Sequence, residues 1–114
     1  MAKDPLEVMA ELEKGMNQIE EECPELSAAF VHMDNAAYIE GELARKYKEL
    51  IGLGIAVALR CEYCINIHVK QAFQEGASRE EILEAAAVGV AFGGSPSMAQ
   101  VATQVLKALE SFEE

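Results

Sequence analysis

Residues 50–59 read LIGLGIAVAL, a run without a single charged or polar side chain. A helix that lacks a polar face is buried on most of its sides, so the stretch from Ala44 to Leu59 predicts the central helix of the fold. Gly52 and Gly54 would each destabilise this helix by about 1 kcal/mol relative to alanine, and close approach of a neighbouring helix would offset that loss. A buried strand is the alternative interpretation of the same run.

The chain before this run predicts a helix near the N-terminus. Asp4 suits the N-cap, Pro5 suits the first helical position, and Glu7 completes a variant of the capping box. Pro24 either closes this helix or begins the next one. Its apolar residues recur every three or four positions and predict one apolar stripe, at the end of which Cys23 packs as a core residue. The stripe consists of Leu6, Met9, Leu12, Met16, Ile19 and Cys23.

The remaining segments also carry helical signals. Between residues 24 and 41, Asp34-Asn35 interrupts a helical composition, which predicts two short helices. A helix over about residues 61–75 is expected to stop at Gly76.

The C-terminal part predicts two more helices. Ser78 opens a capping box for a helix over residues 79–91, and Ser95 with Pro96 begins a final helix that ends near Phe112. No segment alternates convincingly as a strand would. The predicted fold class is therefore all-α, a single-domain helical bundle of about six or seven helices spanning residues 1–114.

Composition narrows the function. The 114 residues are 51% hydrophobic and 25% charged, as in an ordinary soluble globular domain. The net charge of −11 repels phosphate backbones and anionic lipids, which argues against a nucleic-acid or membrane partner. The N-terminus lacks the apolar segment of a signal peptide, and three cysteines are few for a disulfide scaffold, so we expect a cytoplasmic protein.

The segment RCEYCINIHVK, residues 60–70, concentrates the reactive side chains. On a helix, Cys61, Cys64 and His68 fall within an arc of roughly 60 degrees and share one face. His68 follows Cys64 by one turn, so a histidine acting as base would serve Cys64. The helix dipole instead favours a thiolate at Cys61, nearer the helix start. These two arguments select different nucleophiles.

Three interpretations of this segment are open. Two cysteines three residues apart can cycle between dithiol and disulfide. Alternatively, the three side chains are simply packed on a buried face. A zinc site would need a fourth ligand, for which Cys23, His32 and Glu49 are candidates but do not form a second close pair.

Together with Glu49, these residues form a Glu-x11-Cys-x2-Cys-x3-His arrangement that resembles the alkyl hydroperoxidase D-like branch of the carboxymuconolactone decarboxylase family. The resemblance covers most of residues 41–110. It implies a helical bundle that assembles as a trimer or hexamer, a thiol-dependent peroxidase or disulfide reductase activity, and no cofactor. A lipoamide-bearing or thioredoxin-like protein would supply the electrons.

Carried over by position, Cys64 resembles the peroxidatic cysteine, Cys61 the resolving one, and His68 a proton relay with Glu49 as its acidic partner. Glu49 alone would be interpreted as an exposed helix acid. Proteins of this branch can carry a second histidine just before the second cysteine, where this chain has Tyr63.

Two other functions remain as alternatives. The decarboxylase branch of the same family acts on a cyclic lactone acid without relying on the cysteine pair, and an acidic chain would not preferentially attract that anionic substrate. The chain could also be a non-enzymatic zinc or redox-sensing helical module.

Overall fold

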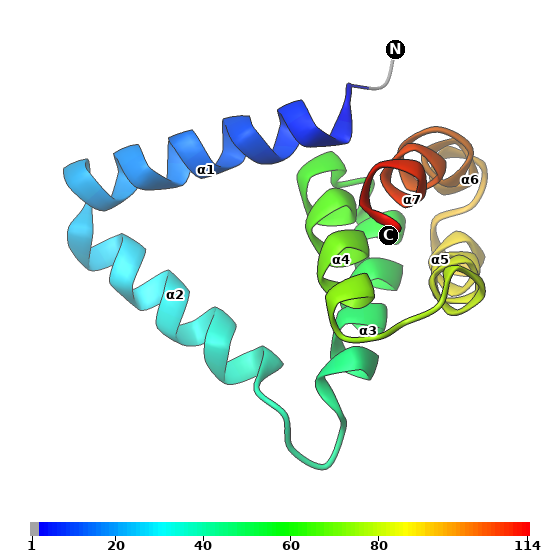
Figure 1. Cartoon of the computed structure of the whole chain (residues 1–114), viewed down its shortest axis with the longest axis horizontal. Helices are drawn as coiled ribbons and strands as arrows, with labels where there is room; N and C mark the ends of the chain where they lie inside the picture. The colour runs from blue at the N-terminus through cyan, green and yellow to red at the C-terminus, as the bar shows by residue number, and fades with distance from the viewer. Residues whose placement is uncertain (1–2) are drawn as a thin grey trace.

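The computed structural model describes residues 3–114, and within this range it is all-α (Figure 1). The described residues contain no strand, so the predicted class is confirmed and the strand alternative for residues 50–59 is wrong. The elements are α1 (Pro5–Glu22), α2 (Pro24–Tyr38), α3 (Arg45–Leu59), α4 (Glu62–Gln74), α5 (Arg79–Gly93), α6 (Ser95–Gln100), the π-helical turn η1 (Val101–Val105) and α7 (Leu106–Phe112).

The helix starts follow the predicted capping signals. The Asp4 side chain accepts the backbone N–H of Leu6 at 3.2 Å at the start of α1. At the start of α5, the Ser78 hydroxyl accepts the N–H of Glu81 and the Glu81 carboxylate accepts the N–H of Ser78. This reciprocal pair, together with Lys46, lowers the pKa of Glu81, with the backbone hydrogen bond from Ser78 as the largest cause.

Two predicted boundaries are wrong. Asp34-Asn35 does not interrupt the second segment, because α2 runs unbroken to Tyr38 and the carbonyl of Asn35 accepts the N–H of Ile39. Ser95 lies inside α6, and Gly94, with a φ of 72°, is the N-cap instead. Glycine adopts this left-handed φ without the steric penalty that serine would meet.

The last eighteen helical residues, 95–112, form one continuous rod that changes hydrogen-bonding pattern in the middle. The turn η1 is π-helical, and its Thr103 hydroxyl donates to the carbonyl of Ala99 at 2.7 Å. Ser97 is buried before this turn, and Ala108 and Leu109 are buried after it. Before this turn the rod packs on α3 and α5, and after it the rod packs on α4 and α1.

Small residues let α3 and α5 approach closely. A Cβ atom on Gly54 would lie 3.2 Å from the carbonyl oxygen of Ala85, and one on Gly89 would overlap the carbonyl oxygen of Gly54. The predicted close approach at Gly54 is thus confirmed. Ser97 supports the same region, because its buried hydroxyl donates to the carbonyl of Val57 at 2.8 Å.

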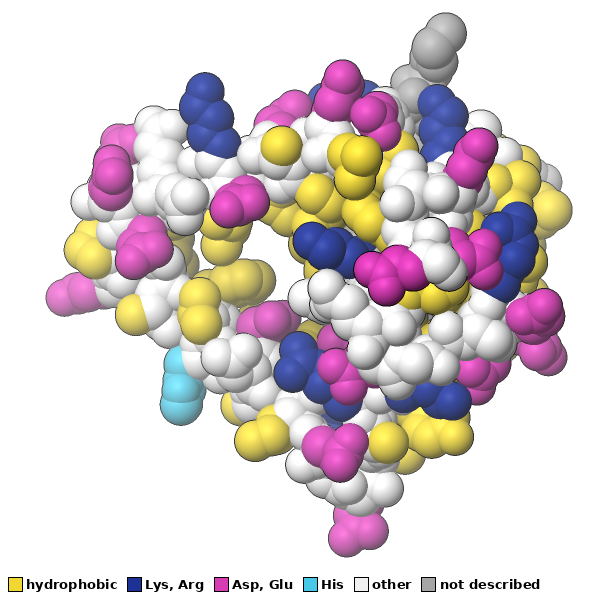
Figure 2. All heavy atoms as spheres, in the orientation of Figure 1, with side chains coloured by type: hydrophobic (Ala, Val, Ile, Leu, Met, Phe, Trp, Pro, Cys, Tyr) yellow, Lys and Arg dark blue, Asp and Glu magenta, His cyan; other side chains and the backbone are white. Residues whose placement is uncertain are grey.

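Helices α1 and α2 form an arm that projects from the body made by α3 to α7 (Figure 1). An opening remains between arm and body in the space-filling view of Figure 2. Pro5 and Val8 are the buried residues of α1, and Ser27 is the buried residue of α2. None of the six residues of the predicted apolar stripe is therefore buried, and Cys23, at the junction of the two helices, is exposed rather than packed.

The central helix α3 is also less enclosed than the sequence predicts. Leu53, Ala56 and Val57 are buried, but Leu59 remains 71% exposed. The face left open also carries Ile51 and Ile55. None of the helices described over residues 3–114 combines the length and hydrophobicity needed to cross a bilayer.

The close approach of α3 and α5 generates a prediction. Gly89→Ala should lower the free energy of unfolding by about 1–3 kcal/mol, because the added methyl group meets backbone that cannot yield easily. Gly15→Ala is the matched control, since nothing lies within 4 Å of a Cβ placed there. It should raise the free energy of unfolding by up to about 1 kcal/mol. Urea titration at fixed protein concentration measures both, and equal midpoints would contradict the packing argument.

Candidate active site

The two cysteines of the motif meet where α3 turns into α4. Arg60 adopts a left-handed conformation, with φ 57°, and the N–H of Cys61 donates to the carbonyl of Ala56 at 3.0 Å. This closes α3 in the manner of a Schellman motif. Cys61 then becomes the N-cap of α4, so it lies just outside the helix rather than on its first turn as predicted.

Cys61 and Cys64 are joined by a disulfide, with their Cα atoms 5.2 Å apart. The Cys61 sulfur also accepts the backbone N–H of Cys64 at 3.3 Å and so caps the first turn of α4. Both residues are partly buried. The pair is therefore present in its oxidised form, at the end of α4 where unpaired N–H groups favour a developing negative charge on sulfur.

His68, one turn after Cys64 on α4, forms a pair with Glu49 of α3. The Nδ1 atom of His68 lies 2.9 Å from Oε1 of Glu49, which is 0% exposed on α3. A carboxylate only accepts hydrogen bonds, so the ring N–H is assigned to Nδ1 and Nε2 is left with a lone pair. The interpretation of Glu49 as an ordinary exposed acid is wrong, and its pairing with His68 matches the expectation from the family resemblance.

Two further donors surround the Glu49 carboxylate. The Arg45 guanidinium, one turn earlier on α3, lies 3.7 Å from Oε2. With its amide nitrogen facing the carboxylate, Gln71 of α4 donates to Oε1 at 2.9 Å and to Oε2 at 3.2 Å. Neither residue belongs to the Glu-x11-Cys-x2-Cys-x3-His motif. Their spacing was a usable signal, because Arg45 precedes Glu49 by four residues and Gln71 follows His68 by three.

The free Nε2 atom of His68 faces Tyr38, the last residue of α2. The hydroxyl oxygen of Tyr38 lies 3.4 Å from Nε2, and the two ring centroids are 5.4 Å apart. Burial raises the pKa of Tyr38, and the charge of Glu49 adds to the effect. No sequence signal identified this residue, because it stands outside the motif on a helix whose other contacts are few.

Gly52 makes room for this contact. A Cβ atom there would lie 2.7 Å from the Tyr38 hydroxyl and 2.8 Å from Cε1 of His68. The neighbour that requires glycine at position 52 is thus a pair of side chains, whereas at Gly54 it is a helix.

Tyr63, between the two cysteines, connects the site to the arm. Its hydroxyl donates to Oε1 of Glu11 at 2.6 Å, and Lys3 lies 3.6 Å from the other oxygen of the same carboxylate. The hydrogen bond from Tyr63 lowers the pKa of Glu11, with Lys3 as the next cause, and hydrogen bonding to Glu11 raises the pKa of Tyr63. The residue that departs from the family pattern therefore contacts α1.

The other candidates are placed elsewhere. Cys23 and His32 are exposed on the arm. Within residues 3–114, no three His, Cys, Asp or Glu side chains are grouped as metal ligands would be.

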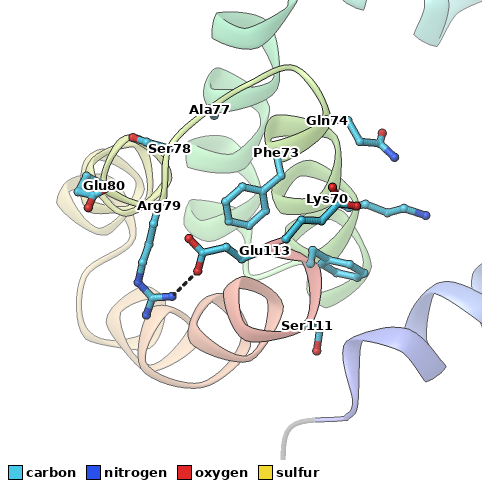
Figure 3. Close-up of a pocket in the computed structure, with 11 residues that line it drawn as sticks. Lys70, Phe73, Gln74, Ala77, Ser78, Arg79, Glu80, Ser111 and Glu113 are labelled. Atoms are coloured by element: carbon cyan, nitrogen blue, oxygen red, sulfur yellow. Dashed lines mark hydrogen bonds and ion pairs between the residues drawn. The ribbon is translucent and has the colours of Figure 1, made fainter.

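Two cavities lie away from the motif. One of about 510 Å³ is lined by residues of α4, α5 and the C-terminal segment, and Figure 3 shows Phe73 and Lys70 in its wall beside the Arg79–Glu113 ion pair. The other, of about 610 Å³, is an apolar groove between α3 and α5. None of the residues Glu49, Cys61, Cys64 and His68 lines either cavity.

The structure thus brings all four predicted site residues into one region, with a redox-capable sulfur pair and a histidine oriented by a buried carboxylate. In this oxidised form His68 makes no hydrogen bond to Cys64 among the described residues, and its contacts are to Glu49 and Tyr38. A dithiol, a base and an acid–base partner are the elements of thiol redox chemistry.

Comparison with known proteins agrees with this geometry. The family model of the carboxymuconolactone decarboxylase family matches residues 24–108. An uncharacterized protein of Cupriavidus necator is 30% identical over 105 residues, which are 92% of this chain and 89% of that protein. An uncharacterized protein from the cox locus of Paracoccus denitrificans is 39% identical over 57 residues, 50% of this chain and 51% of its own.

Two solved structures are similar over nearly the whole chain. A carboxymuconolactone decarboxylase family protein from Legionella pneumophila, in its apo form, superimposes with a TM-score of 0.91 at 34% identity, covering 96% of this chain and 97% of its own. A family member from Thermotoga maritima, for which a part in the antioxidative response has been suggested, gives 0.79 at 35% identity, covering 96% and 89%.

The His68–Glu49 pair predicts a fixed tautomer. Nitrogen NMR, recorded where the His68 ring is neutral, should show its proton on Nδ1, because only that nitrogen faces a carboxylate. His32, exposed on the arm, is the internal reference. Glu49→Gln should weaken the preference, since an amide can accept or donate. A wild-type His68 with its proton on Nε2 would contradict the assigned orientation.

Proposed function

The chain belongs to the carboxymuconolactone decarboxylase family, and we propose that it is a thiol-dependent peroxidase, an antioxidant oxidoreductase of the alkyl hydroperoxidase D type. The observation that carries the proposal is the Cys61–Cys64 disulfide at the start of α4, the helix that also carries a histidine paired with a buried carboxylate. A packed face of inert cysteines would not need that pair. In the proposed cycle this disulfide is the oxidised product.

The cycle has two chemical steps. His68 takes the Cys64 thiol proton through its free Nε2, directly or through water, and the thiolate attacks the terminal oxygen of a hydroperoxide. The O–O bond breaks, its electron pair leaves with the alkoxide, and that oxygen is protonated to an alcohol. Cys64 is left as a sulfenic acid, which condenses with the Cys61 thiol to form the disulfide and release water.

The choice of Cys64 as nucleophile is supported by position. Cys64 precedes His68 by one helical turn, whereas Cys61 is the N-cap and lies a further turn away. A thiol reductant, lipoamide-bearing or thioredoxin-like and expected in the cytoplasm, would return the disulfide to two thiols by exchange. The lactone decarboxylase alternative has no use for either sulfur.

Oxidation of the reduced protein tests the proposal. Titration with hydrogen peroxide or an organic hydroperoxide should remove two hydrogens from the wild type, as measured by intact mass. Cys61→Ser should trap Cys64 as a sulfenic acid, and Cys64→Ser should not react at a comparable rate because the remaining thiol lies further from His68.

Two outcomes would contradict the proposal. If both thiols stay reduced in excess oxidant, the redox function is wrong, and lactone turnover and metal content are measured next. If Cys64→Ser reacts as fast as Cys61→Ser, the assignment of the nucleophile is wrong.

We further propose that the chain functions as a homo-oligomer, because two apolar surfaces lack a partner within the chain. The groove between α3 and α5 is lined without a charged residue, and Phe92 at its edge is 85% exposed. The arm carries a second stripe, Leu26, Phe30 and Met33, at helical spacing on α2. Surfaces of this kind mark interaction sites. A second copy of the chain can cover each surface with apolar residues of its own and brings no charged residue into the groove.

The oligomer is tested by light scattering after size-exclusion chromatography. The wild type should have a mass of at least twice the 12.4 kDa of one chain. Phe92→Asp should shift the protein toward the monomer, because a buried carboxylate without a partner is strongly unfavourable. Leu106→Asp, at a half-exposed position on α7 outside both surfaces, is the control and should leave the mass unchanged. A monomeric wild type at micromolar concentration would refute the proposal.

A further inference from the structure

The base of the site has one free nitrogen, and this nitrogen faces a tyrosine. Glu49 holds the Nδ1 side of His68, which leaves Nε2 as the atom that can take or give a proton. The Tyr38 hydroxyl lies 3.4 Å from it. This distance is long for a hydrogen bond, as is common for catalytic contacts in a resting site. Any proton exchanged at Nε2 is therefore exchanged next to this hydroxyl.

A hydroxyl suits both protonation states of the histidine. It can donate its proton to the lone pair of neutral Nε2, and it can accept the Nε2–H of an imidazolium through its own lone pair. Burial and the neighbouring Glu49 raise the pKa of Tyr38, so the hydroxyl keeps its proton at neutral pH.

The placement of Tyr38 is specific. Ser27 is the one α2 residue that is buried, yet the last residue of this helix reaches the ring of His68. Gly52 leaves a space in which any Cβ atom would collide with the Tyr38 hydroxyl and the His68 ring. The arm thus delivers one polar group to the base, and the central helix leaves space for it.

We propose that Tyr38 is the proton relay between His68 and the leaving oxygen of the hydroperoxide. The inference rests on the proposed peroxidase function and adds a residue to it. After His68 has taken the Cys64 proton, sulfur attacks and the O–O electron pair leaves with the alkoxide. Tyr38 gives its hydroxyl proton to that alkoxide and takes the Nε2 proton of the imidazolium. The products are the sulfenic acid, the alcohol, neutral His68 and an unchanged tyrosine.

Two reactions of the same sulfur separate this role from a structural one. The reaction of Cys64 with tert-butyl hydroperoxide needs a thiolate and a proton for the leaving oxygen. Its alkylation by iodoacetamide needs the thiolate but releases iodide, which requires no proton. Both rates are measured by intact mass in a Cys23→Ser/Cys61→Ser background, where Cys64 is the one remaining cysteine.

In this background, Tyr38→Phe should slow the peroxide reaction by about 100-fold, the low end of what a positioned proton donor contributes. Its alkylation rate should stay within about twofold of the parent, since thiolate formation at His68 is unchanged.

Tyr63→Phe is the matched control. It also removes a hydroxyl that ties the arm to α4, here the hydrogen bond to Glu11, but it leaves the partner of His68 in place. The ratio of peroxide to alkylation rates should therefore equal that of the parent.

Three results would overturn the relay. They are a peroxide rate that is unchanged in Tyr38→Phe, an equal loss of the peroxide and alkylation rates, and a ratio of the two rates that falls as far in Tyr63→Phe as in Tyr38→Phe. If the parent is alkylated but does not react with hydroperoxide, the peroxidase function itself fails and the relay fails with it. A parent that reacts while Tyr38→Phe keeps the same ratio refutes the relay alone.

Discussion

A carboxylate removed from water must be surrounded by hydrogen-bond donors, and Glu49 obtains them from both helices that build the site. Arg45 shares its helix, while His68 and Gln71 come from α4. Breaking such a set strands a buried charge, which is far more costly than losing an exposed ion pair. The requirement fixes how α4 lies against α3. It thereby fixes the orientation of His68 and the end of α4 at which the two cysteines sit.

The rest of the molecule is organised around this pair of helices. Small residues bring α5 against the other side of α3, and the arm of α1 and α2 remains splayed from the body. Side-chain contacts near the two ends of the arm both lead to α4, through Glu11 to Tyr63 and through Tyr38 to His68. The helix that carries the sulfurs is therefore also the helix on which the arm rests.

Much of this could be predicted from local signals. Proline and capping residues located the start of α1 and of α5, and Gly76 the end of α4, because these residues act on the backbone within one turn. The spacing of the motif located the cysteine pair and His68 for the same reason. The close approach at Gly54 was indicated only by the general cost of glycine inside a helix. The role of Glu49 was indicated only by the spacing of the family motif. Neither residue shows in the sequence which groups surround it in the fold.

Other features depended on contacts between distant segments and left no local trace. Tyr38 meets His68 across thirty residues. Asp34 and Asn35 disfavour helix only weakly, so neighbouring alanines and a continuing hydrogen-bond ladder override them in α2. The apolar stripe of α1 was visible as a repeat of apolar residues every three or four positions. Such a repeat does not show which part of the protein, if any, packs against the stripe. The exposure of Ile55 and Phe92 likewise cannot be read from a sequence that is uniformly apolar there.

The π-helical turn between α6 and α7 gives the end of the chain room to lose one residue. A π-helical turn closes i→i+5 hydrogen bonds and so holds one residue more than an α-helical turn. Loss of a single codon within residues 101–105 would let the rod return to an ordinary α-helix, and Ala108 and Leu109 would keep their places in the core. The same loss within residues 50–55 of α3 would turn every following side chain of that helix by about 100 degrees and take Val57 out of the core.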